Sequence, residues 1–201
     1  TPKVTKETKL VQEQRLIKTQ AVRRRSKTPI RQEKLTFVES LSTILDNEER
    51  RDPKSLIYIK KFKQEKIRQE LLQIAYKEIN EKAFGSQLPA DMKIEWNKKL
   101  RSTGGYCRNS INNHTHTRTC EIHISIKVCN TPERMRDTLA HEMCHAAAFL
   151  IDGVRDGHGP IWKRWANQVN FTFKYIPKIT ITHSYSIDKK YIYRCQKCLQ
   201  E

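Results

Sequence analysis

Two histidines and a glutamate stand together in the run His141-Glu142-Met143-Cys144-His145. On an α-helix, residues four apart lie on one face, so His141 and His145 can direct ring nitrogens at the same ion. Glu142 lies about 100° round the helix from His141. Its carboxylate is then beside the ion, where it can take a proton from water instead of filling a coordination position. This spacing is typical of a hydrolytic Zn²⁺ site.

A third ligand for such an ion has to come from outside that helix. His158 is the candidate, because a loop bounded by Gly153 and Gly157 is long enough to reverse the chain before it. Three protein ligands leave a fourth position open for water, which is the catalytic arrangement of zinc and not the closed structural one. The alternative for His158 is a surface or capping role. Cys144 is expected to pack beside the helix and not to bind the ion.

Two helices must position these side chains. Thr131-Pro132 is an N-cap followed by proline at the first helical position, and Gly153 supplies a stop. Between them a buried apolar stripe recurs at three- and four-residue spacing: Met135, Leu139, Met143, Ala146 and Leu150. Pro160 opens a second helix, whose buried side carries Ile161, Trp162, Trp165 and Val169. Asp137, one turn before His141, is a candidate to orient its ring.

The residues ahead of the metal helix predict more helix and a small sheet. A short helix is expected over 36–45 and a long one over 52–82. Three strands follow, at Met92–Trp96, Gly105–Ile111 and Thr119–Val128. The last strand alternates apolar and polar residues and places His123 on its exposed side. We expect one of the two hairpin strands to pair with an extended substrate, and Gly104-Gly105 to permit close backbone approach.

Several motifs together resemble the SprT-like metalloprotease domain. They are the zinc motif, the run Arg155-Asp156-Gly157-His158-Gly159-Pro160, and Leu88-Pro89, Ile94-Glu95-Trp96-Asn97 and Gly105-Tyr106-Cys107. The resemblance implies an α+β, zincin-like fold over 35–178, with helices packed on a small three-stranded sheet. It also implies Zn²⁺ held by His141, His145 and His158, with Glu142 as the catalytic base.

A C-terminal region, 179–201, completes the expected organisation. It is predicted to form a β-hairpin leading into Cys195-x-x-Cys198, a possible second metal site. A structural zinc usually has four ligands, and this pair supplies two. Because the family often continues into a second cysteine pair, the resemblance implies a partial, apparently truncated zinc ribbon. A second, structural ion is expected only if further ligands follow.

Charge points to a polyanionic partner. The chain carries 39 Lys and Arg against 22 Asp and Glu, a net charge of +17. Residues 1–34 hold eleven basic residues and three Glu and are predicted to be a disordered basic tail. The Spartan branch of the family stacks unpaired bases on aromatics beside basic residues. By that resemblance the candidate contacts, which could instead be tyrosines filling a hairpin face, are Tyr185, Lys189, Lys190, Tyr191, Tyr193, Arg194 and Lys197.

The function expected from these features is a zinc-dependent endopeptidase acting on proteins bound or crosslinked to DNA, including single-stranded regions, in DNA–protein crosslink repair. The resemblance implies a nuclear, chromatin-associated protein. Scattered cysteines favour reduced thiols, and the lack of a long apolar stretch argues against a membrane partner. Two alternatives stay open: a non-catalytic, zinc-stabilised chromatin or DNA-binding module, and a peptidase independent of nucleic acid.

Overall fold

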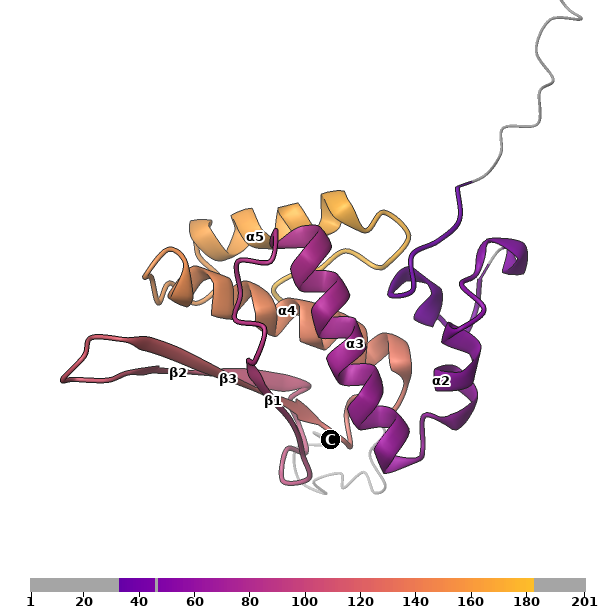
Figure 1. Cartoon of the computed structure of the whole chain (residues 1–201), viewed down its shortest axis with the longest axis horizontal. Helices are drawn as coiled ribbons and strands as arrows, with labels where there is room; N and C mark the ends of the chain where they lie inside the picture. The colour runs from indigo at the N-terminus through magenta and orange to yellow at the C-terminus, as the bar shows by residue number, and fades with distance from the viewer. Residues whose placement is uncertain (1–32, 46, 183–201) are drawn as a thin grey trace, which may run out of the picture. The chain divides into compact units, whose positions relative to one another are not determined.

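The computed structural model describes residues 33–45 and 47–182, which contain four α-helices and a three-stranded sheet (Figure 1). The mixed α+β class expected from the sequence is confirmed. No helix in these ranges is long and apolar enough to cross a membrane. In chain order the elements are the 3₁₀ turns η1 (Glu39–Leu41) and η2 (Glu48–Arg50), α2 (Ser55–Lys61), α3 (Glu65–Ala83), β1 (Lys93–Asn97), β2 (Gly105–Ile111), β3 (Arg118–Ser125), α4 (Pro132–Leu150) and α5 (Pro160–Thr172).

The sheet has the order β1-β3-β2, with β3 in the centre. Strand β1 runs parallel to β3, pairing Ile94 with Ile122, and β2 runs antiparallel to it, pairing Cys107 with Ile122. The apolar residues of β3 share one parity, so Ile122 and Ile124 are both fully buried. Among the described strands, β2 has a single neighbour and therefore forms one edge of the sheet.

Helix α4 is the centre of the molecule's core. It packs on β2 and β3 on one side and against α3 and α5 on the other (Figure 1). The Thr131 side chain caps its first turn by accepting from the amide of Arg134, and Pro132 is its first residue. Gly153, at φ 75°, turns the chain away after its last turn. A helix that is covered on both sides buries most of its surface, and in α4 the buried residues include Arg136, His141 and Glu142.

The single long helix expected over 52–82 is wrong, because the chain breaks between α2 and α3. Phe62 and Ile67 are five residues apart, which on one continuous helix puts them about 140° out of register. Phe62 is buried and packs edge-on against Trp96, with ring centroids 6.1 Å apart. Gln64 takes an extended conformation, which ends the first helix and starts the second in a new direction.

The helix expected over 36–45 shrinks to the 3₁₀ turn Glu39–Leu41, after which Ser42 is extended. The guanidinium of Arg51 donates to the carbonyls of both Ser40 and Ser42. Those carbonyls are then satisfied by a side chain and not by amides four residues later, so the helix does not continue.

Two predicted strands also differ from the structure. Strand β3 stops at Ser125, before the expected Val128, because the amide of Val128 bonds to the Ser125 hydroxyl in a turn. Residue 180 has no regular secondary structure and residues 181–182 form a bend, so these described residues do not start a strand. The rest of the expected C-terminal hairpin and the N-terminal tail lie outside the described residues.

Candidate metal centre

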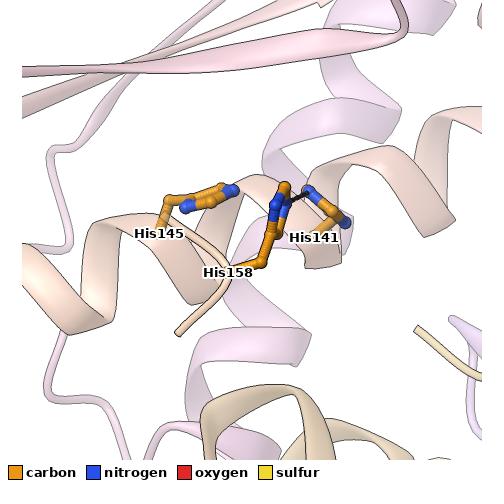
Figure 2. A group of neighbouring side chains, drawn as sticks. All are labelled: His141, His145 and His158. Carbon is orange, nitrogen blue, oxygen red and sulfur yellow. Dashed lines mark hydrogen bonds between the residues drawn. The ribbon is translucent and has the colours of Figure 1, made fainter. Parts of the chain in front are cut away.

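Three histidines converge on one point beside α4 (Figure 2). His141 and His145 come from consecutive turns of that helix, and His158 reaches the same point from the loop before α5. One ring nitrogen from each lies within 4.8 Å of the others, and the Nε2 atoms of His141 and His158 are 3.0 Å apart. Tetrahedral zinc with bonds of 2.0–2.1 Å needs separations of about 3.4 Å. The donor set therefore fits such an ion after small adjustments of the rings.

The loop that carries His158 is shaped by its neighbours. Gly157 has φ 59°, a left-handed conformation that glycine adopts without strain. The Asp156 carboxylate accepts a hydrogen bond from the amide of Ile161 and so caps the start of α5. A Cβ at Gly159 would lie 2.6 Å from that carboxylate, so only glycine leaves it room. The Asp-Gly-His-Gly-Pro run thus makes a capped turn that points one histidine back at α4.

Trp162, in the first turn of α5, forms the floor under the histidines. Its ring centroid lies 4.8 Å from that of His141, 5.6 Å from His145 and 4.7 Å from His158. The side chain is fully buried. The sequence marks Trp162 as an ordinary core residue, and only its position four residues after His158 hints at this contact.

The electrostatics of the site favour a neutral imidazole at His145. Burial, together with the charge of nearby His158, lowers the pKa of His145 to about 4. At neutral pH its ring is therefore neutral and has one unprotonated nitrogen, which is the form that binds metals. The Nδ1 atom of His141 lies 3.0 Å from the carbonyl oxygen of Thr180, a partner that the sequence did not suggest. Asp137, the expected partner, accepts a hydrogen bond from Arg136.

Glu142 is buried on the cleft side of α4. Burial raises the pKa of its carboxyl to about 8, although a backbone hydrogen bond from Cys107 acts in the opposite direction. A carboxyl of this pKa is a stronger base toward a water molecule than an exposed glutamate is. Without an ion this carboxyl is largely protonated at neutral pH, and a cation bound by the three histidines would favour its ionised, proton-accepting form.

A cleft of about 570 Å³ opens over these residues. One wall is strand β2 and the residues before it, and the other is the loop carrying Val154–His158. The close approach of Gly105 is to the protein itself: a Cβ there would lie 2.8 Å from the carbonyl oxygen of His123 and 3.3 Å from Cγ of Glu142. Because this residue has no side chain, β2 can lie directly against α4.

His123 differs from its expected exposed position. Its side chain is 12% exposed and its ring stacks on Tyr106, with centroids 4.7 Å apart. The two residues face each other across the β2–β3 ladder. Alternation along β3 alone could not show that a tyrosine on the neighbouring strand covers this side chain.

The comparison with known families decides the chain's identity. The SprT-like family matches residues 72–183, more than half of the chain, and the match spans all three histidines and Glu142. The chain belongs to the SprT-like family. This confirms the resemblance drawn from the motifs.

Germ cell nuclear acidic proteins are among the relatives of this SprT-like chain. The protein of that name in Drosophila melanogaster is 38% identical over 165 residues, covering 82% of this chain and 15% of the relative. Germ cell nuclear acidic-1 protein of Caenorhabditis elegans is 37% identical over 177 residues, covering 87% and 32%. The Homo sapiens protein is 40% identical over 130 residues, covering 64% and 19%. The chain spans less than a third of each of these three relatives.

The remaining predicted site residues are cysteines and the C-terminal candidates for metal or nucleic-acid binding. Cys144 is fully buried and its thiol donates to a backbone carbonyl, in keeping with a packing role. The four cysteines in the described part of the SprT-like chain are free thiols. The second metal pair and the nucleic-acid candidates all lie outside the described residues: Cys195, Cys198, Tyr185, Lys189, Lys190, Tyr191, Tyr193, Arg194 and Lys197.

Proposed function

We propose that this SprT-like chain is a zinc-dependent endopeptidase that acts on proteins bound or crosslinked to DNA. The observation that carries the proposal is the convergence of His141, His145 and His158 next to the buried carboxyl of Glu142, at the base of a cleft. A purely structural ion has no use for a basic carboxyl beside it, whereas peptide hydrolysis needs one.

The chemistry divides between the ion and the chain. His141, His145 and His158 would hold the zinc ion, which when bound would polarise the peptide carbonyl and make water nucleophilic at neutral pH. The Glu142 carboxylate accepts a proton from the attacking water and delivers it to the nitrogen of the departing amine. Hydrogen bonding from the Cys107 backbone holds that carboxylate in place.

The substrate chain is held along the sheet edge. Strand β2 has one neighbour among the described strands, so its other side is available for pairing with an extended peptide. Residues Gly105, Tyr106 and Cys107 of this strand line the cleft next to Glu142. Of the two hairpin strands, β2 is therefore the one that would carry the substrate, because β3 is central and already paired on both sides.

Recruitment by DNA is the second part of the proposal. It is supported by the net charge of +17 and by kinship with proteins named germ cell nuclear acidic protein. The working location would be chromatin in the nucleus, and the DNA would include single-stranded regions. Specificity would then come less from a side-chain pocket than from bringing DNA-bound protein to a permissive cleft.

The test is cleavage of a DNA-bound basic protein by zinc-loaded enzyme, with and without single-stranded DNA. Glu142→Gln removes the base and is expected to abolish cleavage while zinc content is retained. The matched control is Glu81→Gln, an exposed position on α3, which should cleave like the wild type. Cleavage that ignores DNA would point to a general peptidase. Zinc and DNA binding without any cleavage would point to a non-catalytic chromatin module.

DNA contacts by the C-terminal residues need their own test. Lys189→Ala combined with Lys190→Ala should weaken binding to single-stranded DNA and reduce its salt dependence. The control is Lys60→Ala with Lys61→Ala, which removes the same charge from the exposed face of α2. Equal losses in both double variants would mean that net charge alone, and no local site, binds the DNA.

A further inference from the structure

Asn170, on the last turns of α5, holds a segment far along the chain by two hydrogen bonds. Its side-chain oxygen accepts from the amide of Ile179 at 2.7 Å, and its side-chain nitrogen donates to the carbonyl of the same residue at 3.2 Å. One amide side chain thus satisfies both backbone groups of one residue, as a neighbouring β-strand would. The backbone at Ile179 is fixed in orientation as a result.

The next peptide unit contacts the metal centre. The carbonyl oxygen of Thr180 lies 3.0 Å from Nδ1 of His141, across 39 residues of sequence. Ile179 itself is buried in the core, so its side chain and its backbone are both anchored. These anchors hold the Thr180 α-carbon, which the two adjoining peptide units share, so only the torsions of Thr180 itself remain to aim its carbonyl.

The chemistry of imidazole makes this carbonyl important. A neutral ring carries one N–H, and a carbonyl oxygen can only accept. With its Nδ1 bonded to Thr180, His141 therefore keeps its proton on Nδ1 and presents an unprotonated Nε2. That Nε2 is the atom that faces His158 at 3.0 Å. Loss of the carbonyl would remove this preference for a proton on Nδ1.

We propose that Asn170 is a positioning residue for the metal centre: by clamping Ile179 it aims the Thr180 carbonyl at His141 and fixes the ligand tautomer of that ring. The inference rests on the proposed function, in which His141 binds zinc through Nε2. Asn170 itself touches neither the ion nor the substrate. It acts on His141 indirectly, through its hydrogen bonds to Ile179 and the contact of the Thr180 carbonyl with the His141 ring.

Three variants test this inference. Asn170→Ala removes both hydrogen bonds, and Asn170→Asp keeps an acceptor for the shorter one but loses the donor. Gln168→Ala, at an exposed position of the same helix, is the matched control. The zinc dissociation constant, measured by competition with a chromophoric chelator, should rise about 10–100-fold in Asn170→Ala, less in Asn170→Asp, and not at all in the control.

A second readout separates positioning from mere stabilisation. In the metal-free protein, ¹⁵N chemical shifts of the His141 ring should report a single Nδ1–H tautomer in the wild type and a mixture in Asn170→Ala. Cobalt-substituted samples should show an altered visible spectrum in the same variant. Unchanged tautomer and zinc affinity in folded Asn170→Ala or Asn170→Asp would overturn the inference. If the wild type holds the tautomer but binds no zinc, the proposed function fails and the positioning role of Asn170 stands.

Discussion

The Nε2 atoms of His141 and His158 face each other at 3.0 Å, although they belong to different elements of the fold. Two ring lone pairs at that distance repel each other unless a proton or a cation lies between them. A shared proton satisfies these two atoms, whereas a divalent ion satisfies them together with His145. The position of the loop before α5 therefore depends on whether a proton or a metal ion lies between these two rings.

Removing His158 should therefore weaken metal binding severely. His158→Ala leaves two ligands on α4, and the loss in zinc affinity should exceed the roughly 100-fold that changes in outer-shell partners cost. The measurement is chelator competition, with His114→Ala as control because His114 is exposed in the β2–β3 turn. A His158→Ala protein that still binds zinc like the control would make His158 a capping or surface residue after all.

The acidity of Glu142 predicts a pH dependence of stability in the metal-free protein. Its pKa is raised from 4.5 to about 8 by burial, so between these values the folded state binds more protons than the unfolded state. This contribution to stability is complete below pH 4.5 and is lost as the pH rises through 8. The loss is on the order of 5 kcal/mol. Urea titrations should show wild type and Glu142→Gln diverging over that range, while Glu81→Gln follows the wild type.

His145 acts with the opposite sign in the same experiment. Its folded pKa of about 4 lies below the usual 6.5, so protons favour the unfolded state between these values. Stability should rise with pH from 4 to 6.5 on its account. Comparing Glu142→Gln with wild type cancels this effect, because both proteins retain His145. Parallel curves for the two proteins would mean that Glu142 stays ionised in the metal-free fold.

Gly105 is expected to tolerate no side chain. A Cβ there would lie 2.8 Å from the backbone oxygen of His123 and 3.0 Å from Cγ2 of Thr138, so β2 would have to move away from α4. Gly105→Ala should lower the free energy of unfolding by about 1–3 kcal/mol and slow cleavage. Gly157→Ala is the comparison, because its Cβ would meet nothing within 4 Å and only its φ of 59° is unfavourable. Equal stability of Gly105→Ala and wild type would refute this account of the strand's position.

The role of Trp162 in supporting the three histidines can be tested by comparing it with Trp165 on the same helix. Trp162→Phe shrinks the ring under all three histidines, whereas Trp165→Phe changes a ring that stacks on Phe84. Both should reduce stability, because both side chains are buried. Only Trp162→Phe should also weaken zinc binding, by about tenfold. Thermal melts of the metal-free proteins and chelator competition separate the two effects.

The parts of this site that are local in sequence could be predicted, and the parts that depend on tertiary contact could not. Thr131, Pro132 and Gly153 mark both ends of α4, and the spacing of His141 and His145 then places two ligands. The break at Gln64 was missed because apolar periodicity does not say which helix face a distant tryptophan will cover.

Long-range partners show the same limit. The group of Thr180 that contacts His141 is a backbone carbonyl, which every residue has. The residue type at position 180 therefore could not predict this contact. Similarly, the stacking of Tyr106 on His123 depends on the register between two strands, which the sequence alone leaves open. The sequence predicted which side chains lie together within one helix or strand. Contacts between different elements could be identified only from the three-dimensional structure.

The bond between His141 and Thr180 also sets an order of events during synthesis. The ribosome releases the chain from its N-terminus, so α4 emerges well before the segment that holds His141 in its ligand form. A nascent chain that ends before Thr180 lacks this contact, even with all three histidines already made. On the proposed function, metal loading and the onset of hydrolysis would thereby wait until Thr180 has emerged, after all three histidines.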